Sequence, residues 1–188
     1  MKINYNTTNK LKFEITKQFF DSADGYELVQ YSLEVPEIQD ASCEEVARHS
    51  AVYAAKELGE ACVVMDAGFS VNALNGFPGP FVKYVNEWLS EDRLLRMLDE
   101  NDDRSAHFTD ALAIGFPDGT AKVFSQKIMG RLAQRGEYTP SKWSANSLFI
   151  PEGYSMPLGS MSEQEQTDFW HDGNKNWPRL VVYLAERV

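Results

Sequence analysis

One carboxylate stands out as a candidate for chemistry, in the stretch "MDAGFSVNALNGFPGPFVKYVNEWL" at residues 65–89. Asp66 closes the apolar run "CVVMD", which reads as a short buried strand. In open α/β sheets, ligands bind at the carboxyl ends of the strands. Asp66 is therefore placed to bind a cation or to accept a proton. A structural role, in which Asp66 only caps a turn, fits the same pattern and stays open.

The residues after Asp66 must position whatever binds there. Gly68 permits a tight turn, "LNG" supplies a second, and "PGP" fixes the start of a helix, with Pro80 in its first turn. The helix carries apolar residues at i, i+3, i+4, i+7 and i+8. This spacing predicts a buried stripe made of Phe81, Tyr84, Val85, Trp88 and Leu89.

The other helices and strands are predicted from apolar periodicity and from capping and turn residues. Ser42 and Glu45 form a capping box, and Gly59 ends the helix that follows, which carries a stripe of alanines. "PDGT" separates two long strand-like segments and predicts a hairpin. The order predicts an α/β fold: a mixed, twisted sheet with helices on both sides and a long β-hairpin. We expect strands at 2–5, 27–35, 62–66, 105–116 and 121–134, and helices at 10–20, 42–59, 80–90, 92–99 and 178–187.

Composition narrows the function classes. The chain has 188 residues and a net charge of −10, so its surface repels phosphate backbones and nucleic-acid binding is not expected. An anionic ligand would need a local cluster of cationic groups with a metal. The two cysteines form no motif, and no signal peptide or long apolar run is visible. We expect a cytoplasmic protein that does not bind membranes.

Residues 65–85, "MDAGFSVNALNGFPGPFVKYV", resemble the signature of the inosine triphosphate pyrophosphatase family, whose members act on non-canonical purine nucleoside triphosphates. The family form is approximately Glu-Asp-(Thr/Ser)-Gly-Leu followed by Ala-Leu-X-Gly-X-Pro-Gly. Weaker likeness covers most of the chain, in "NKL", "VPEIQ", "GRLAQRG" and "LFIPEGY". The resemblance implies that residues 1–188 form a single domain with two lobes around a central cleft.

The resemblance also implies a reaction and a set of residues. A nucleoside triphosphate would bind with Mg²⁺, or alternatively Mn²⁺, and water would attack the α-phosphate to release nucleoside monophosphate and pyrophosphate. Asp66 corresponds to a general base or metal ligand, and Glu37 of "VPEIQ" to a metal ligand. Family members are usually homodimers, which we expect here. The substrate-binding positions implied are Thr7, Asn9, Lys10, Lys83, Arg135, Asn146, Phe149 and Arg179. For Phe149, a core position is an equal alternative.

Several positions depart from the family pattern. The acidic residue before the catalytic aspartate is Met65, and a family lysine on the second helix is replaced by Ser50. His49 points away from the alanine stripe, so we expect it to be solvent-exposed. The Gly-aromatic-Asp-Pro motif becomes residues 144–147, where Asn146 loses the charge, and a Ser-His-Arg motif has no clear counterpart in "HDGNKNWPRL". We therefore expect a shifted base preference.

Three functions compete. The first is the Mg²⁺-dependent nucleoside triphosphate pyrophosphohydrolase. The second is a non-catalytic nucleotide-binding protein on the same fold, motivated by the missing lysine and acidic neighbour. The third is an interaction module whose interface uses exposed aromatics such as Trp170 and Trp177. Release of pyrophosphate from a panel of nucleotides would separate the first from the others.

Overall fold

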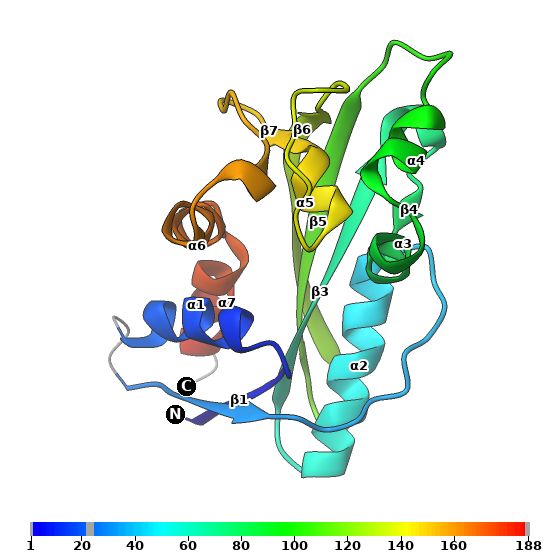
Figure 1. Ribbon diagram of the computed structural model, residues 1–188. Coiled ribbons are helices and arrows are strands. Elements are labelled where there is room, and N and C mark those ends of the chain that lie inside the picture. Colours follow the sequence, from blue (N-terminus) through cyan, green and yellow to red (C-terminus); the bar gives the residue numbers. More distant parts are fainter. Residues whose placement is uncertain (1, 22–24, 187–188) are drawn as a thin grey trace. The chain divides into compact units, whose positions relative to one another are not determined.

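The computed structural model describes residues 2–21 and 25–186. Within these residues one sheet holds seven strands, in the order β2-β1-β3-β5-β6-β7, with β4 paired to β3 (Figure 1). β1 pairs in parallel with β2 and β3, whereas β6 and β7 are antiparallel. The predicted mixed sheet and long hairpin are confirmed. The strands are β1 (Lys2–Asn6), β2 (Glu27–Tyr31), β3 (Cys62–Val71), β4 (Pro78–Gly79), β5 (Ser105–Gly115), β6 (Ala121–Leu132) and β7 (Phe149–Pro151).

The helices connect these strands and follow most of the predicted positions. The chain divides into two compact units, which are described separately: residues 1–66, 110–126 and 170–188 form unit 1, and residues 67–109 and 127–169 form unit 2. The helical elements are α1 (Lys10–Asp21), α2 (Cys43–Leu58), η1 (Asn72–Leu74), α3 (Val82–Trp88), α4 (Glu91–Arg96), α5 (Ser144–Leu148), η2 (Leu158–Ser160), α6 (Glu163–Asp172) and α7 (Asn176–Ala185).

In unit 1, helices cover both faces of the sheet (Figure 1). On one face, α1 and α7 pack on β1, β3 and β5 through a core centred on Trp177, which is 1% exposed and contacts Tyr5 and Phe20 edge-on. On the other face α2 packs on β3 and β5. Because side chains alternate along a strand, Met65 faces α1 and α7, whereas its neighbour Asp66 faces α2.

The capping box and the alanine stripe explain the position of α2. Ser42 accepts a hydrogen bond from the backbone N–H of Glu45, and Gly59 ends the helix in a left-handed conformation, with φ of 69°. The small alanine side chains are fully buried and let the helix approach the sheet closely. His49, predicted to be solvent-exposed, is half-buried, and its Nδ1 atom is buried.

Gly115 marks the closest approach of α2 to β5. A Cβ atom added at Gly115 would overlap the backbone carbonyl group of Ala51 and the backbone nitrogen of Val52. The obstruction is main chain within a helix, so no side-chain rotation relieves it. The helix and the strand can lie at this distance only because position 115 has no side chain.

We expect Gly115→Ala to lower the free energy of unfolding by about 1–3 kcal/mol, the usual range for overpacking a close-packed core. Urea denaturation of the purified variant measures this. Adding Ala51→Gly should not restore stability, because the overlap involves backbone atoms of residue 51 and not its side chain. A Gly115→Ala variant as stable as the wild type would show that α2 does not pack this closely.

Unit 2 has its own core of aromatic and leucine side chains. Phe69 of β3, Phe108 of β5 and Phe149 of β7 pack together, with ring centroids 4.8–5.7 Å apart. Leu94 and Leu95 of α4 are also buried. The core of this unit is therefore built on the packing of aromatic rings.

The prediction of a buried stripe along α3 is wrong. Of its five residues only Val85 is buried, whereas Phe81, Tyr84 and Trp88 are 40%, 36% and 66% exposed. The apolar periodicity predicted the helix correctly but not which of its side chains are buried. The Tyr84 and Trp88 rings stack on each other on the outer surface, with centroids 5.5 Å apart.

Two strand boundaries and two helices also differ from the sequence prediction. β3 continues through Gly68 to Val71, so no tight turn occurs at Gly68, and the chain turns at Asn75 and Gly76, which both have positive φ. β2 ends at Tyr31 instead of residue 35. The helices α5 and α6 were not predicted, because their short polar sequences carry little apolar periodicity.

Candidate functional site

Asp66 lies on the part of β3 that extends past its parallel neighbour. The register pairs Tyr5 of β1 with Val63, so Asp66 is three residues beyond that pair. Its side chain is half-buried. This is the carboxyl end of the parallel part of the sheet, where α/β proteins bind ligands.

The Cys43 side chain lies beside Asp66 and interacts with its carboxyl group. It is the first residue of α2 and is 4% exposed. Burial raises the pKa of the Cys43 thiol to about 12, and the negative charges of Asp66 and Glu44 raise it further, together with a hydrogen bond to Asp66. The thiol is therefore neutral at physiological pH and holds the Asp66 carboxylate without competing for a proton.

Lys12 is a functional candidate that sequence reasoning missed. It lies in the first turn of α1, is half-buried, and its Nζ donates to the carbonyl oxygen of Met65 at 3.5 Å. An ammonium group has three N–H donors. Within residues 2–21 and 25–186, this is the one hydrogen bond that the Lys12 ammonium makes. Residues two apart on a helix do not face each other, so the choice of Lys10 did not also indicate Lys12.

Asp110 of β5 carries a second buried carboxyl group, 6% exposed. Burial raises its pKa to about 6, although the positive charge of Lys12 and hydrogen bonds from Asn176 and Asn174 oppose that rise. Its Oδ2 accepts from Asn174 Nδ2 at 2.9 Å and from Asn176 Nδ2 at 3.3 Å. Asp110 and Lys12 attract each other without forming a direct ion pair.

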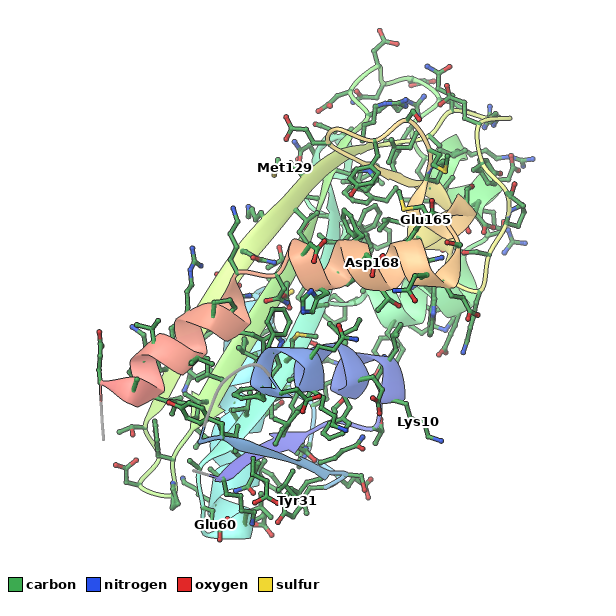
Figure 2. The ribbon with its side chains drawn as sticks, turned by 90° about the vertical axis from the view of Figure 1, so that its left-hand side faces the viewer. Lys10, Tyr31, Glu60, Met129, Glu165 and Asp168 are labelled. Carbon is green, nitrogen blue, oxygen red and sulfur yellow. The ribbon has the colours of Figure 1, made fainter. Side chains whose placement is uncertain are left out.

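The three residues predicted at the β1–α1 turn are placed differently. Thr7 and Asn9 shape the turn: Thr7 Oγ1 accepts from the backbone N–H of Asn9, and Asn9 Oδ1 accepts from that of Lys12. Lys10 is exposed at the start of α1 (Figure 2). Asn9 thus caps the helix that carries Lys12, and the side chain that reaches β3 is that of Lys12.

Glu37 and Asp66 are the candidate metal ligands. Glu37 is exposed on the connection between β2 and α2, and the same connection leads to Cys43 beside Asp66. Across the described parts of the chain, no group of three or more His, Cys, Asp or Glu side chains could hold a metal ion. Carboxylate oxygens are the ligands Mg²⁺ prefers, and one or two of them usually suffice when phosphates and water complete the shell. The donor types therefore fit a Mg²⁺ bound together with a polyphosphate.

Arg179 is also in unit 1. It is exposed in the first turn of α7, and its Nη1 donates to the backbone carbonyl of Ser125 at 3.2 Å. No hydrogen bond or ion pair joins Arg179 to Lys12 or Asp110 in the described part of the chain. Its role in substrate binding stays a prediction.

Four predicted residues lie in unit 2. Lys83 is exposed, with its Nζ 5.8 Å from the centre of the Tyr84 ring. Arg135 forms ion pairs with Asp99 at 2.8 Å and Asp92 at 3.5 Å, so a phosphate would compete with two carboxylates for it. The other two are Asn146, half-buried in α5, and Phe149, which is fully buried in the aromatic core of unit 2. Phe149 thus adopts the core position that the sequence left as an alternative.

A model of the Ham1 family matches residues 3–174. The chain belongs to the Ham1 family. A dITP/XTP pyrophosphatase of Methanopyrus kandleri is 33% identical over 173 residues, which cover 91% of this chain and 90% of that protein. One from Hyperthermus butylicus is 34% identical over 169 residues, covering 89% of this chain and 86% of that protein.

Solved structures agree with the Ham1 fold. The nucleoside-triphosphatase, or dITP/XTP pyrophosphatase, of Mycobacterium abscessus is 27% identical with a TM-score of 0.73, covering 98% of this chain and 97% of that one. The Ham1 protein of Staphylococcus aureus is 25% identical with a TM-score of 0.79, and each chain is covered completely. The family resemblance, the fold class and the pyrophosphatase class of enzyme, all expected from the sequence, are confirmed.

In the described ranges, no helix is both long and apolar enough to cross a membrane. This finding does not test the expected cytoplasmic location, which stays a prediction.

Proposed function

We propose that this Ham1-family chain hydrolyses a nucleoside triphosphate between the α- and β-phosphates, releasing nucleoside monophosphate and pyrophosphate. The observation that carries the proposal is that Asp66 and the Met65 carbonyl bound by Lys12 are adjacent at the carboxyl end of β3. Asp66 supplies a half-buried carboxylate. Lys12 supplies an ammonium group that makes one of its three possible hydrogen bonds to the described residues. The names of the dITP/XTP pyrophosphatase relatives support this substrate class.

The residues have separate roles in the proposed step. Asp66 accepts a proton from the water that attacks the α-phosphorus, and the bond from that phosphorus to the bridging oxygen breaks. Lys12 balances charge on the phosphate oxygens as it builds up. A divalent cation held by Glu37 and Asp66 would neutralise phosphate charge when bound. Cys43 keeps the Asp66 carboxylate in place through its neutral thiol.

We also propose that the base preference differs from that of the dITP/XTP pyrophosphatases. Ser50 on α2 is 9% exposed and uncharged, and Asn146 in α5 carries no charge. The resemblance places charged family residues at both positions. A neutral side chain changes which hydrogen bonds and charges a purine edge or phosphate can meet.

A panel of nucleoside triphosphates tests the activity. We expect the purified protein to release pyrophosphate, and not orthophosphate, from at least one canonical or modified nucleotide in the presence of Mg²⁺ or Mn²⁺. Removal of the metal with a chelator should stop turnover. If nucleotides raise the melting temperature but no pyrophosphate appears across the panel, the chain is the non-catalytic nucleotide-binding protein instead.

The interaction-module alternative loses part of its basis. Trp177 is buried in the core of unit 1 and Trp170 is half-buried, so neither offers the open aromatic surface that this alternative requires. The homodimer and the single domain with two lobes around a cleft remain proposals.

A further inference from the structure

Burying the carboxyl group of Asp110 lowers the stability of the fold. A carboxylate with little solvent around it loses hydration, and burial is the main reason its pKa is raised to about 6. The Asp110 Oδ1 atom is buried and accepts no hydrogen bond from the described residues. A residue kept only for stability would have both oxygens satisfied, so Asp110 calls for another explanation.

The partners of Asp110 fix it rigidly. Asn176 Nδ2 donates both to Oδ2 and to the backbone carbonyl of Asp110, the latter at 2.9 Å. Asn174 uses both ends of its side chain: its amide donates to Asp110 Oδ2, and its Oδ1 accepts from the backbone N–H of Asn176 and Trp177 at the start of α7. Gln126 of β6 holds the same turn by accepting from the Lys175 backbone N–H at 2.8 Å.

Lys12 is the positively charged group that acts on Asp110. It is the strongest of the influences that lower the Asp110 pKa. Among the described residues, the Tyr5 hydroxyl is a second ionisable group that interacts with Asp110: burial raises the pKa of Tyr5, and the negative charge of Asp110 raises it further. From the α6–α7 turn, the groups that contact Asp110 are the neutral amides of Asn174 and Asn176. The Lys12 charge therefore acts on Asp110 of β5, while its one hydrogen bond to the described residues goes to the Met65 carbonyl.

We propose that Asp110, fixed by Asn174 and Asn176, is a positioning residue that holds the Lys12 ammonium at the end of β3 to meet a polyphosphate. The absence of a direct ion pair is part of this role, because it leaves N–H donors of Lys12 for the phosphate oxygens. The inference rests on the proposed function for its substrate. The competing explanation is that Asp110 only fastens α7 to the sheet.

Binding of inorganic tripolyphosphate with Mg²⁺, measured by calorimetry, tests this without requiring turnover. We expect Asp110→Asn to weaken binding by about 5- to 20-fold, because an amide keeps the shape but removes the charge that attracts Lys12. If Asp110 acts through Lys12, then Asp110→Asn added to Lys12→Met should weaken binding by less than twofold more. Additive losses in the double variant, or wild-type protein that does not bind tripolyphosphate, would contradict the proposal.

The thermal stability of Asp110→Asn shows whether Asp110 positions Lys12 or only fastens α7 to the sheet. The folded-state pKa of Asp110 is above its ordinary value of 3.8, so its ionisation costs the wild type stability as pH rises through about 6. We expect Asp110→Asn to melt at the same temperature as the wild type or higher at pH 7.5, with this advantage shrinking toward pH 4. A variant that melts several degrees lower at pH 7.5 and binds tripolyphosphate normally would show that Asp110 only fastens α7. Failure to release pyrophosphate, with tripolyphosphate binding intact, would overturn the proposed reaction and leave this inference standing.

Discussion

Asp66→Asn should reduce the turnover number for nucleoside triphosphate hydrolysis by about 100-fold or more, the scale of a positioned general base. The amide has nearly the same size as the carboxylate but cannot accept the proton of the attacking water. Asp66 is half-buried beside the neutral thiol of Cys43, and removing a charge from such a place should not weaken the fold. Initial rates of pyrophosphate release, with melting temperatures measured in parallel, check both statements.

Glu57→Gln is the matched control for Asp66→Asn. Glu57 is an exposed acid on α2, and the same change of charge there should leave turnover within about twofold of the wild type, as surface substitutions usually do. If Asp66→Asn retains normal turnover, then Asp66 takes no part in the reaction. Equal losses in both variants would point to net charge and not to a positioned base.

Lys12→Met should lower kcat/KM by about 10- to 100-fold, the loss expected when a charge-assisted hydrogen bond to phosphate is removed. Methionine keeps the apolar stem, so the packing of α1 on unit 1 changes little. Lys17→Met, an exposed position on the same helix, provides a control for loss of one positive charge. Steady-state kinetics over a range of substrate concentrations separates kcat from KM.

The same series compares two lysines directly. The sequence resemblance predicts the phosphate contact at Lys10, whereas the structure places Lys12 against Met65 and near Asp110. If Lys10→Met loses more activity than Lys12→Met, the sequence prediction is correct and the role that we assign to Lys12 is wrong.

Much of the fold was predictable because local signals agreed with tertiary contacts. The capping box at Ser42, the glycine at 59 and the alanine stripe specify α2 almost to the residue. The "PDGT" turn specifies the β5–β6 hairpin. The surface of α3 shows the limit: periodicity marks an apolar stripe, but Phe81, Tyr84 and Trp88 stay exposed to solvent. A sequence pattern cannot show which apolar faces stay uncovered.

The candidate site was predictable in part for a related reason. Asp66 was found because it ends an apolar strand, a signal that lies in consecutive residues. Asp110 and Asn176 are 66 positions apart and meet only because α7 packs beside β5. Met65 and Asp110 share the α1–α7 face on neighbouring strands, so the carboxylate missing at position 65 has a counterpart on β5. Only the folded chain shows this relation.

Hydrolysis in ¹⁸O-labelled water tests the central claim most directly, because it reports which phosphorus atom the water attacks. With the best nucleotide from the panel, we expect one labelled oxygen in the nucleoside monophosphate and none in the pyrophosphate, as read by mass spectrometry of the products. Label in pyrophosphate, or in orthophosphate accompanied by nucleoside diphosphate, would place the attack on another phosphorus and contradict the account.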